Sequence, residues 1–104
     1  MSDDDIVLEI PFTQYLLPYG RLKDVSVTCK NPETYRLAQE FLSAGGRFEC
    51  EVLTTGHVSL TAVYAFDEEE EDCAIEVCNN GAEVPDRVDR LVATAHRVMS
   101  EKSR

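Results

Sequence analysis

Six consecutive acidic residues form the densest group of charged side chains in the sequence. The run consists of Asp67, Glu68, Glu69, Glu70, Glu71 and Asp72. A calcium loop also uses carboxylates, but it staggers them around a turn-forming glycine, which this run lacks. Like charges in succession repel one another and favour an open, solvated turn between two strands. We therefore expect a hairpin tip here. A contact surface for a basic partner is the functional alternative, and a metal site is the least favoured one.

A second acidic segment, residues 3–5, shows that the charge of the chain is local. The net charge is −10 at pH 7, from 20 acidic and 10 basic residues. The two segments hold nine of the acids, so the rest of the chain has 11 acidic residues against 10 basic ones. The sign of the charge and the lack of a basic patch disfavour direct binding to nucleic acid. An acidic segment can instead imitate phosphates and inhibit a basic nuclease or DNA-binding protein, which is our second functional hypothesis.

Cysteine and histidine side chains are the candidates for nucleophilic catalysis. Cys50 and His57 could meet across a predicted hairpin, although Cys50 falls on the side of its strand that should face the core. His96 adjoins the apolar stripe of a predicted helix. The four cysteines form no Cys-x-x-Cys pair, and the sequence has no phosphate loop or nucleophile elbow. We therefore expect no metal, no cofactor and no catalytic residues. An enzyme using cysteine and histidine is the third hypothesis.

Residues 11–21 combine three aromatic side chains, two prolines and an arginine in what should be a surface hairpin. Pro18 and Gly20 favour a turn at residues 17–21. Tyr15, Tyr19 and Arg21 belong to the residue types that most often anchor protein interfaces. They are our candidate contact residues for a protein partner whose identity the sequence does not give. The alternative is that the two tyrosines only brace the turn by packing.

Alternation and helical periodicity predict one α+β domain that covers residues 1–104. The strand-like segments are residues 6–10, 24–29, 47–53, 58–66 and 73–78, and the helical ones are 32–44 and 85–100. This order, ββαβββα, predicts a two-layer sandwich. Its sheet is mostly antiparallel, with about five strands, and two helices cover one face. Residues 1–5 and 101–104 are expected to be flexible.

The predicted sheet keeps one face open. Cys73, Ile75 and Val77 alternate along the last strand and should share its core face. Val63, Ala65 and Ala74 then fall on the second face and make it less polar than a fully solvated one. Two copies could therefore pair as a homodimer through the open face or through a sheet edge.

The sequence contains no apolar stretch near the ~20 residues needed to span a bilayer. Its first residues are acidic where a secretory signal would be basic. We expect a cytoplasmic protein with reduced cysteines and no membrane partner.

Three parts of the chain resemble small bacteriophage- and prophage-encoded proteins that have no assigned function. They are residues 10–21, the block 46–56 followed by 58–61, and residues 80–85. The resemblance implies the cytoplasm of a bacterial or phage-infected cell, and an accessory protein that binds host or phage machinery. Our leading hypothesis is accordingly a small non-enzymatic accessory domain. Its contact surface would be the segment around Tyr15, Tyr19 and Arg21, or the acidic run.

Overall fold

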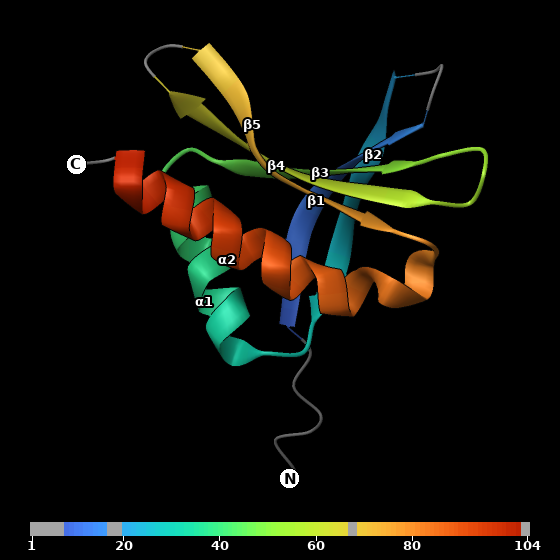
Figure 1. Ribbon diagram of the computed structural model, residues 1–104, viewed down its shortest axis with the longest axis horizontal. Coiled ribbons are helices and arrows are strands. Elements are labelled where there is room, and N and C mark those ends of the chain that lie inside the picture. Colours follow the sequence, from blue (N-terminus) through green and yellow to red (C-terminus); the bar gives the residue numbers. More distant parts are fainter. Residues whose placement is uncertain (1–7, 17–19, 67–68, 103–104) are drawn as a thin grey trace, which may run out of the picture.

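The protein folds into one five-stranded sheet and two helices (Figure 1). The structure is a computed structural model that describes residues 8–16, 20–66 and 69–102. The strands are β1 (Leu8–Leu16), β2 (Gly20–Cys29), β3 (Arg47–Val52), β4 (Val58–Phe66) and β5 (Glu69–Cys78). The helices are α1 (Pro32–Ser43), the 3-10 turn η2 (Gly81–Glu83) and α2 (Val84–Lys102). The predicted α+β class and the predicted order ββαβββα are confirmed.

The strands lie in the order β2-β1-β3-β4-β5. Three neighbouring pairs are antiparallel, namely β1 with β2, β3 with β4 and β4 with β5. The pair β1 and β3 is parallel and covers Thr13–Tyr15 of β1, so the sheet is mixed rather than purely antiparallel. This order leaves β2 and β5 as the two edge strands.

The core lies between the sheet and the helices, which both cover the same face (Figure 1). Phe48 of β3 is at its centre. Its ring centroid is 5.2 Å from that of Phe12 and 5.0 Å from that of Phe41, and Phe41 in turn lies 5.6 Å from Tyr64. Aromatic pairs at these separations pack more favourably than their buried area alone suggests. The core therefore joins β1, α1, β3 and β4 through one row of rings.

Helix α1 begins and ends as its residue types predict. The side chain of Asn31 accepts a hydrogen bond from the backbone N–H of Glu33 at 2.9 Å, and Pro32 occupies the first helical position. At the other end Gly45 has φ +102°, which a residue without Cβ adopts most easily, and the chain turns into β3.

Helix α2 is longer than predicted, since it starts at Val84 and continues to Lys102. Asn80 caps the preceding η2 turn by accepting from the N–H of Ala82 at 2.9 Å. The buried residues of α2 follow one helical stripe, as the periodicity predicted: Val88, Leu91, Val92, Ala95 and Met99.

The first hairpin is also longer than predicted. β1 continues to Leu16, and Gly20 already belongs to β2, where it pairs with Leu16. Gly20 and Arg21 of the predicted turn are therefore strand residues, while residues 17–19 lie outside the described part of the chain. Buried Ile10 and Phe12 pair with Val27 and Val25, which fixes the face of this hairpin that meets the helices.

Candidate functional site

The outer face of the sheet, on the side away from the helices, carries two exposed apolar side chains. Ile75 and Val77 of β5 are 56% and 55% exposed. They pair with Thr61 and Ser59 of β4, and the residue between these two, Leu60, is fully buried on the helix side. Directly opposed residues of an antiparallel pair share a face, so Ile75 and Val77 both point outward.

This orientation corrects the predicted core face of the last strand. Cys73, Ile75 and Val77 do not share the core face, because the register of β5 shifts where Cys73 stands between Asp72 and Ala74. Cys73 packs against the core and its thiol donates to the carbonyl of Ala62 at 3.4 Å. A bulge adds one residue to a strand and reverses the alternation beyond it.

Beyond the bulge the core side of β5 consists of Ala74, Glu76 and Cys78 instead. Ala74 packs against the core, which corrects its predicted place on the second face. Cys78 is fully buried. Glu76 faces Arg87 of α2, with Oε1 3.8 Å from Nη1. A carboxylate can occupy the helix side here because a cation from α2 lies beside it.

Most of the acidic run belongs to a strand and not to a turn. The backbone of residues 69–72 pairs with β4 as the first part of β5, which corrects the predicted open turn. The side chains of Glu69, Glu71 and Asp72 are exposed. Asp72 lies opposite Val63, so it precedes Ile75 on the outer face. Glu71 lies opposite Tyr64, which packs against the core, so Glu71 and its alternate Glu69 are on the helix side of the sheet. Edge strand β5 thus carries exposed acids on both faces and exposed apolar side chains on the outer face. We name these exposed residues the β5 edge: Glu69, Glu71, Asp72, Ile75 and Val77.

Tyr15 takes part in a polar row on the same outer face. Its hydroxyl donates to Oε2 of Glu49 at 3.2 Å, and Nε of Arg47 lies 3.0 Å from the same oxygen. The three side chains come from β1 and β3, which pair in parallel at this point. The tyrosine hydroxyl therefore has a partner within the domain.

The other predicted contact residues are only partly described. Tyr19, Asp67 and Glu68 lie outside the described residues. Arg21 and Glu70 have described backbone positions in β2 and β5, opposite Tyr15 and Ala65. Arg21 and Glu70 thus lie on the two opposite edge strands of the sheet. Sequence reasoning missed Ile75 and Val77 as surface residues, because their alternation with Cys73 is typical of a core face.

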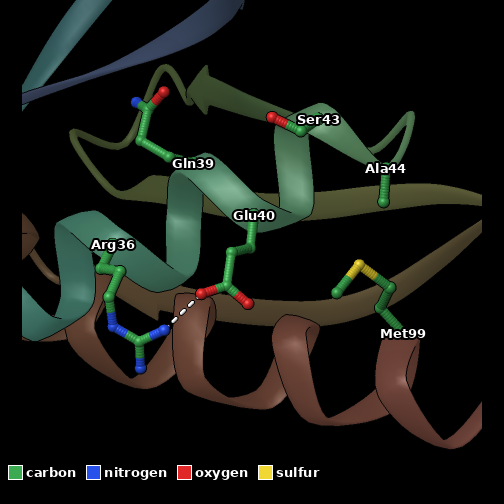
Figure 2. A pocket seen from close by; sticks show the side chains of 6 residues that line it. All are labelled: Arg36, Gln39, Glu40, Ser43, Ala44 and Met99. Atoms are coloured by element: carbon green, nitrogen blue, oxygen red, sulfur yellow. Dashed lines mark hydrogen bonds and ion pairs between the residues drawn. The ribbon is translucent and has the colours of Figure 1, made fainter.

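A shallow pocket of about 520 Å³ lies between α1 and the end of α2. Figure 2 shows Glu40 and Arg36 of α1 beside it, and Met99 of α2 on the other side. The guanidinium of Arg36 is bonded to Glu40. The pocket is lined by Arg36, Gln39, Glu40, Ser43, Ala44 and Met99.

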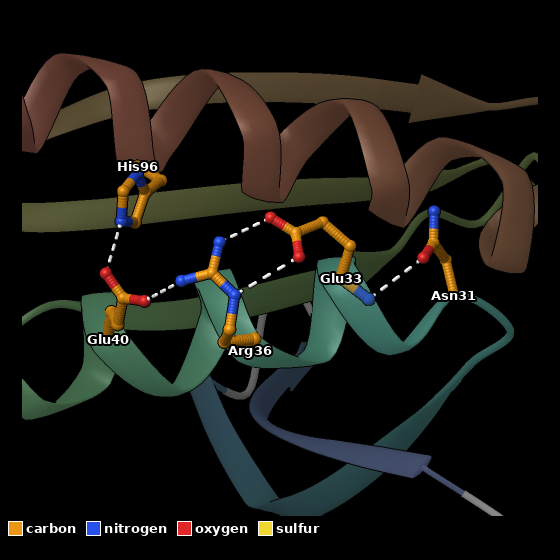
Figure 3. Close-up of polar contacts among 5 residues, drawn as sticks. All are labelled: Asn31, Glu33, Arg36, Glu40 and His96. Carbon is orange, nitrogen blue, oxygen red and sulfur yellow. Dashed lines mark hydrogen bonds and ion pairs between the residues drawn. The ribbon is translucent and has the colours of Figure 1, made fainter.

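A network of charged side chains ties the two helices together (Figure 3). Arg36 bonds Glu33 and Glu40 along α1, and His96 of α2 donates from Nε2 to Oε1 of Glu40 at 2.9 Å. The hydrogen bond from His96, with the charge of Arg36, lowers the pKa of Glu40 below its ordinary value. The bond from Arg36 likewise lowers the pKa of Glu33. The network is exposed, so it stabilises the helix pair only modestly.

The cysteines have the properties of packed side chains. Burial raises the pKa of the thiols of Cys29, Cys50, Cys73 and Cys78. An activated nucleophile needs a lowered pKa. Nδ1 of His57 lies 2.7 Å from the hydroxyl of Thr55, in the turn that joins β3 to β4. The described residues contain no group of three or more His, Cys, Asp or Glu side chains placed to hold a metal ion.

Comparison with models of protein families, with curated proteins and with solved structures finds no match. Neither α1 nor α2 combines the length and the apolarity that a bilayer crossing requires. Among the described surfaces, the β5 edge is the one where exposed apolar and charged side chains adjoin an unpaired strand edge.

Proposed function

We propose that this protein is a small non-enzymatic accessory domain that binds another protein through the β5 edge. The observation that supports the proposal is the exposure of Ile75 and Val77, at 56% and 55%, next to each other on the outer face of an edge strand. Soluble proteins usually protect edge strands with charges, bulges or a covering element. The first half of β5 is protected by acids, but on the outer face of the half with Ile75 and Val77 the described residues place neither a charge nor a covering element. A partner protein would supply that cover.

The experiment compares binding by the wild-type chain with binding by two double variants. Immobilised protein is exposed to extract from the cells that encode it, captured proteins are identified, and each is purified and titrated against the chain. Ile75→Ser with Val77→Ser should weaken binding of the true partner about tenfold, because two exposed apolar side chains lose their contact area. Ser26→Ala with Thr28→Ala changes exposed residues of the other edge strand and should leave the affinity unchanged. Equal binding by all three proteins would contradict the proposal.

The segment around Tyr19 and Arg21 is a second contact surface in this proposal. Tyr15, the third predicted contact residue, has its hydroxyl bonded to Glu49 on the outer face. Replacement of Tyr19 and Arg21 by Ala should weaken capture of the same partner while thermal stability stays unchanged. If capture is unchanged, this segment has no role in binding and the β5 edge is the remaining surface.

Imitation of nucleic acid is the second candidate function. The extended conformation of residues 69–72 supports this function. Alternate carboxylates of a strand are about 7 Å apart, so the negative charges are spread along the strand as phosphates are along a nucleic acid. An inhibitor of this kind would bind a basic nuclease or DNA-binding protein, and its affinity would fall steeply with added salt. Affinity that does not change with salt would contradict this second function.

A further inference from the structure

We propose that the partner is bound as an added β-strand: a basic, extended protein segment pairs with the free edge of β5. This inference rests on the proposed function and names the partner's chemistry. The added segment is rich in Lys or Arg.

The unpaired edge of β5 supplies the backbone part of the site. β5 pairs with β4 on one side, and no described strand pairs with its other side. Every second residue of such an edge directs its N–H and C=O away from the sheet, where an extended peptide can bond to them. The bulge at Cys73 divides this edge into two parts. Residues 74–78 form an uninterrupted ladder with β4, so they can offer regularly spaced bonds to a new strand.

The side chains of β5 select the composition of the added strand. Directly opposed side chains of paired strands lie about 5 Å apart, where opposite charges attract and like charges repel. Glu69, Glu71 and Asp72 therefore favour Lys or Arg opposite the first part of β5. Ile75 and Val77 favour β-branched or other apolar side chains opposite the second part. One segment with both features would cover the whole β5 edge.

The opposite edge strand, β2, lacks this combination. Its outer-face residues Asp24, Ser26 and Thr28 are exposed and polar. Its apolar residues Val25 and Val27 are already partly buried against the core, so a strand added there would cover less exposed apolar surface. The β5 edge, with Ile75 and Val77 more than half exposed, is therefore the edge at which strand addition removes more apolar surface from water.

A second copy of the chain fits this edge less well, because its own charges oppose pairing. Full-length antiparallel pairing of two β5 strands would set Asp72 against Ile75 of the second copy and Glu71 against Glu76 of the second copy. Parallel pairing in register would set each acid against the same acid. A shorter antiparallel pairing centred on Glu76 sets this glutamate against its own copy and leaves the acidic half of β5 unpaired. A segment with basic residues at one end and apolar residues at the other matches both the acidic and the apolar half of β5.

The experiment uses the full chain and three synthetic peptides as long as β5, which has 10 residues. In the first peptide, Lys alternates with Thr in one half, and Val alternates with Thr in the other half. The second replaces Lys by Glu, and the third is the Lys peptide with alternate backbone nitrogens methylated. Isothermal titration calorimetry measures the affinity of the protein for each peptide. Amide chemical shifts and hydrogen exchange of the isotope-labelled protein show which residues each peptide contacts.

The expected result is binding of the Lys peptide, with shift changes and new exchange protection confined to β5. The Glu peptide should bind at least about tenfold more weakly because several cross-strand pairs become repulsive. The methylated peptide should also bind about tenfold more weakly, since it retains the charges but cannot complete the ladder. Ile75→Ser with Val77→Ser, and separately Glu71→Lys with Asp72→Lys, should each reduce the affinity about tenfold. The Ser26→Ala, Thr28→Ala variant is the control and should bind as the wild type does.

Three results would overturn strand addition. They are equal binding of the methylated and unmodified Lys peptides, shift changes on another surface, and a homodimer in light scattering that Ile75→Ser abolishes. These failures are distinct from failure of the proposed function. If a natural partner depends on Ile75 while the Lys peptide does not bind, the interaction domain stands and the basic strand is wrong.

Discussion

Nε2 of His96 lies 2.9 Å from Oε1 of Glu40 and joins α2 to α1 across 56 residues of sequence. The imidazole donates and the carboxylate accepts. Both side chains are partly exposed, so the bond lies at the solvent edge of the helix pair and not in the core. Its main effect on Glu40 is to favour the ionised form, which lowers the pKa of that carboxyl group.

Acid should weaken the contact between the helices as Glu40 becomes protonated. A group whose pKa is lower in the folded than in the unfolded state stabilises the fold above its ordinary pKa, here 4.5. This stabilisation is lost as the pH falls through the lower folded value. His96→Ala should therefore flatten the fall of the melting temperature below pH 4.5. Arg97→Ala, an exposed neighbour on α2, is the control. If the melting temperature of His96→Ala falls with pH in parallel with that of the wild type, the bond between His96 and Glu40 does not contribute to the pH dependence of stability.

Gly46 should tolerate no side chain. A Cβ at this position would lie 2.4 Å from Cε2 of Phe41, whose ring is fully buried and held by neighbouring rings. Gly46→Ala should lower the free energy of unfolding by about 1–3 kcal/mol through overpacking. Gly81→Ala is the matched control, because nothing lies within 4 Å of the added carbon. Urea denaturation measures both. Equal stability of the two variants would mean that the ring of Phe41 moves freely.

The fold could be predicted largely from local signals. Asn31 and Pro32 mark the start of α1, and the alternation around Phe48 and Cys50 identifies the buried face of β3. The sequence carries less information on pairing between distant segments. The parallel contact of Thr13 with Glu49 brings together residues far apart in the chain, and no local pattern specifies it.

The candidate site could be predicted less well, for two physical reasons. A single bulge at Cys73 reverses which side of β5 meets the core, and this placed Ile75 and Val77 on the wrong face. Charge repulsion also suggested a turn for the acidic run, but the β4 backbone opposite Glu71 and Asp72 extends the ladder through it. Backbone pairing therefore decides the conformation of residues whose side chains would favour an open turn.

The thiols should react slowly in the folded protein. Burial raises the pKa of Cys29, Cys50 and Cys78, so the reactive thiolate is scarce near neutral pH. Cys73 is partly exposed and should react first, although its pKa is raised as well. Titration with a thiol reagent at pH 7.5, with each modified site located by mass spectrometry, measures the order. All four cysteines should react at once in denaturant. Rapid reaction of Cys50 in the native protein would instead revive the hypothesis of a cysteine–histidine enzyme.

The acidic half of β5 should limit stability rather than support it. Glu69 and Glu71 are exposed and lie two residues apart on β5. Their negative charges repel each other and that of the neighbouring Asp72. Glu69→Thr with Glu71→Thr removes two of these charges and introduces β-branched residues, which strands favour. The melting temperature should rise at low salt.

Added salt should reduce the difference in melting temperature between the Glu69→Thr, Glu71→Thr variant and the wild type, since mobile ions screen exposed charges. Glu9→Thr on β1 replaces an exposed glutamate outside the run and should show a smaller salt effect. A marked loss of stability in the double variant would show that the carboxylates hold the structure together. Stabilisation of the wild type alone by added Ca²⁺ would then identify the acidic run as a metal site after all.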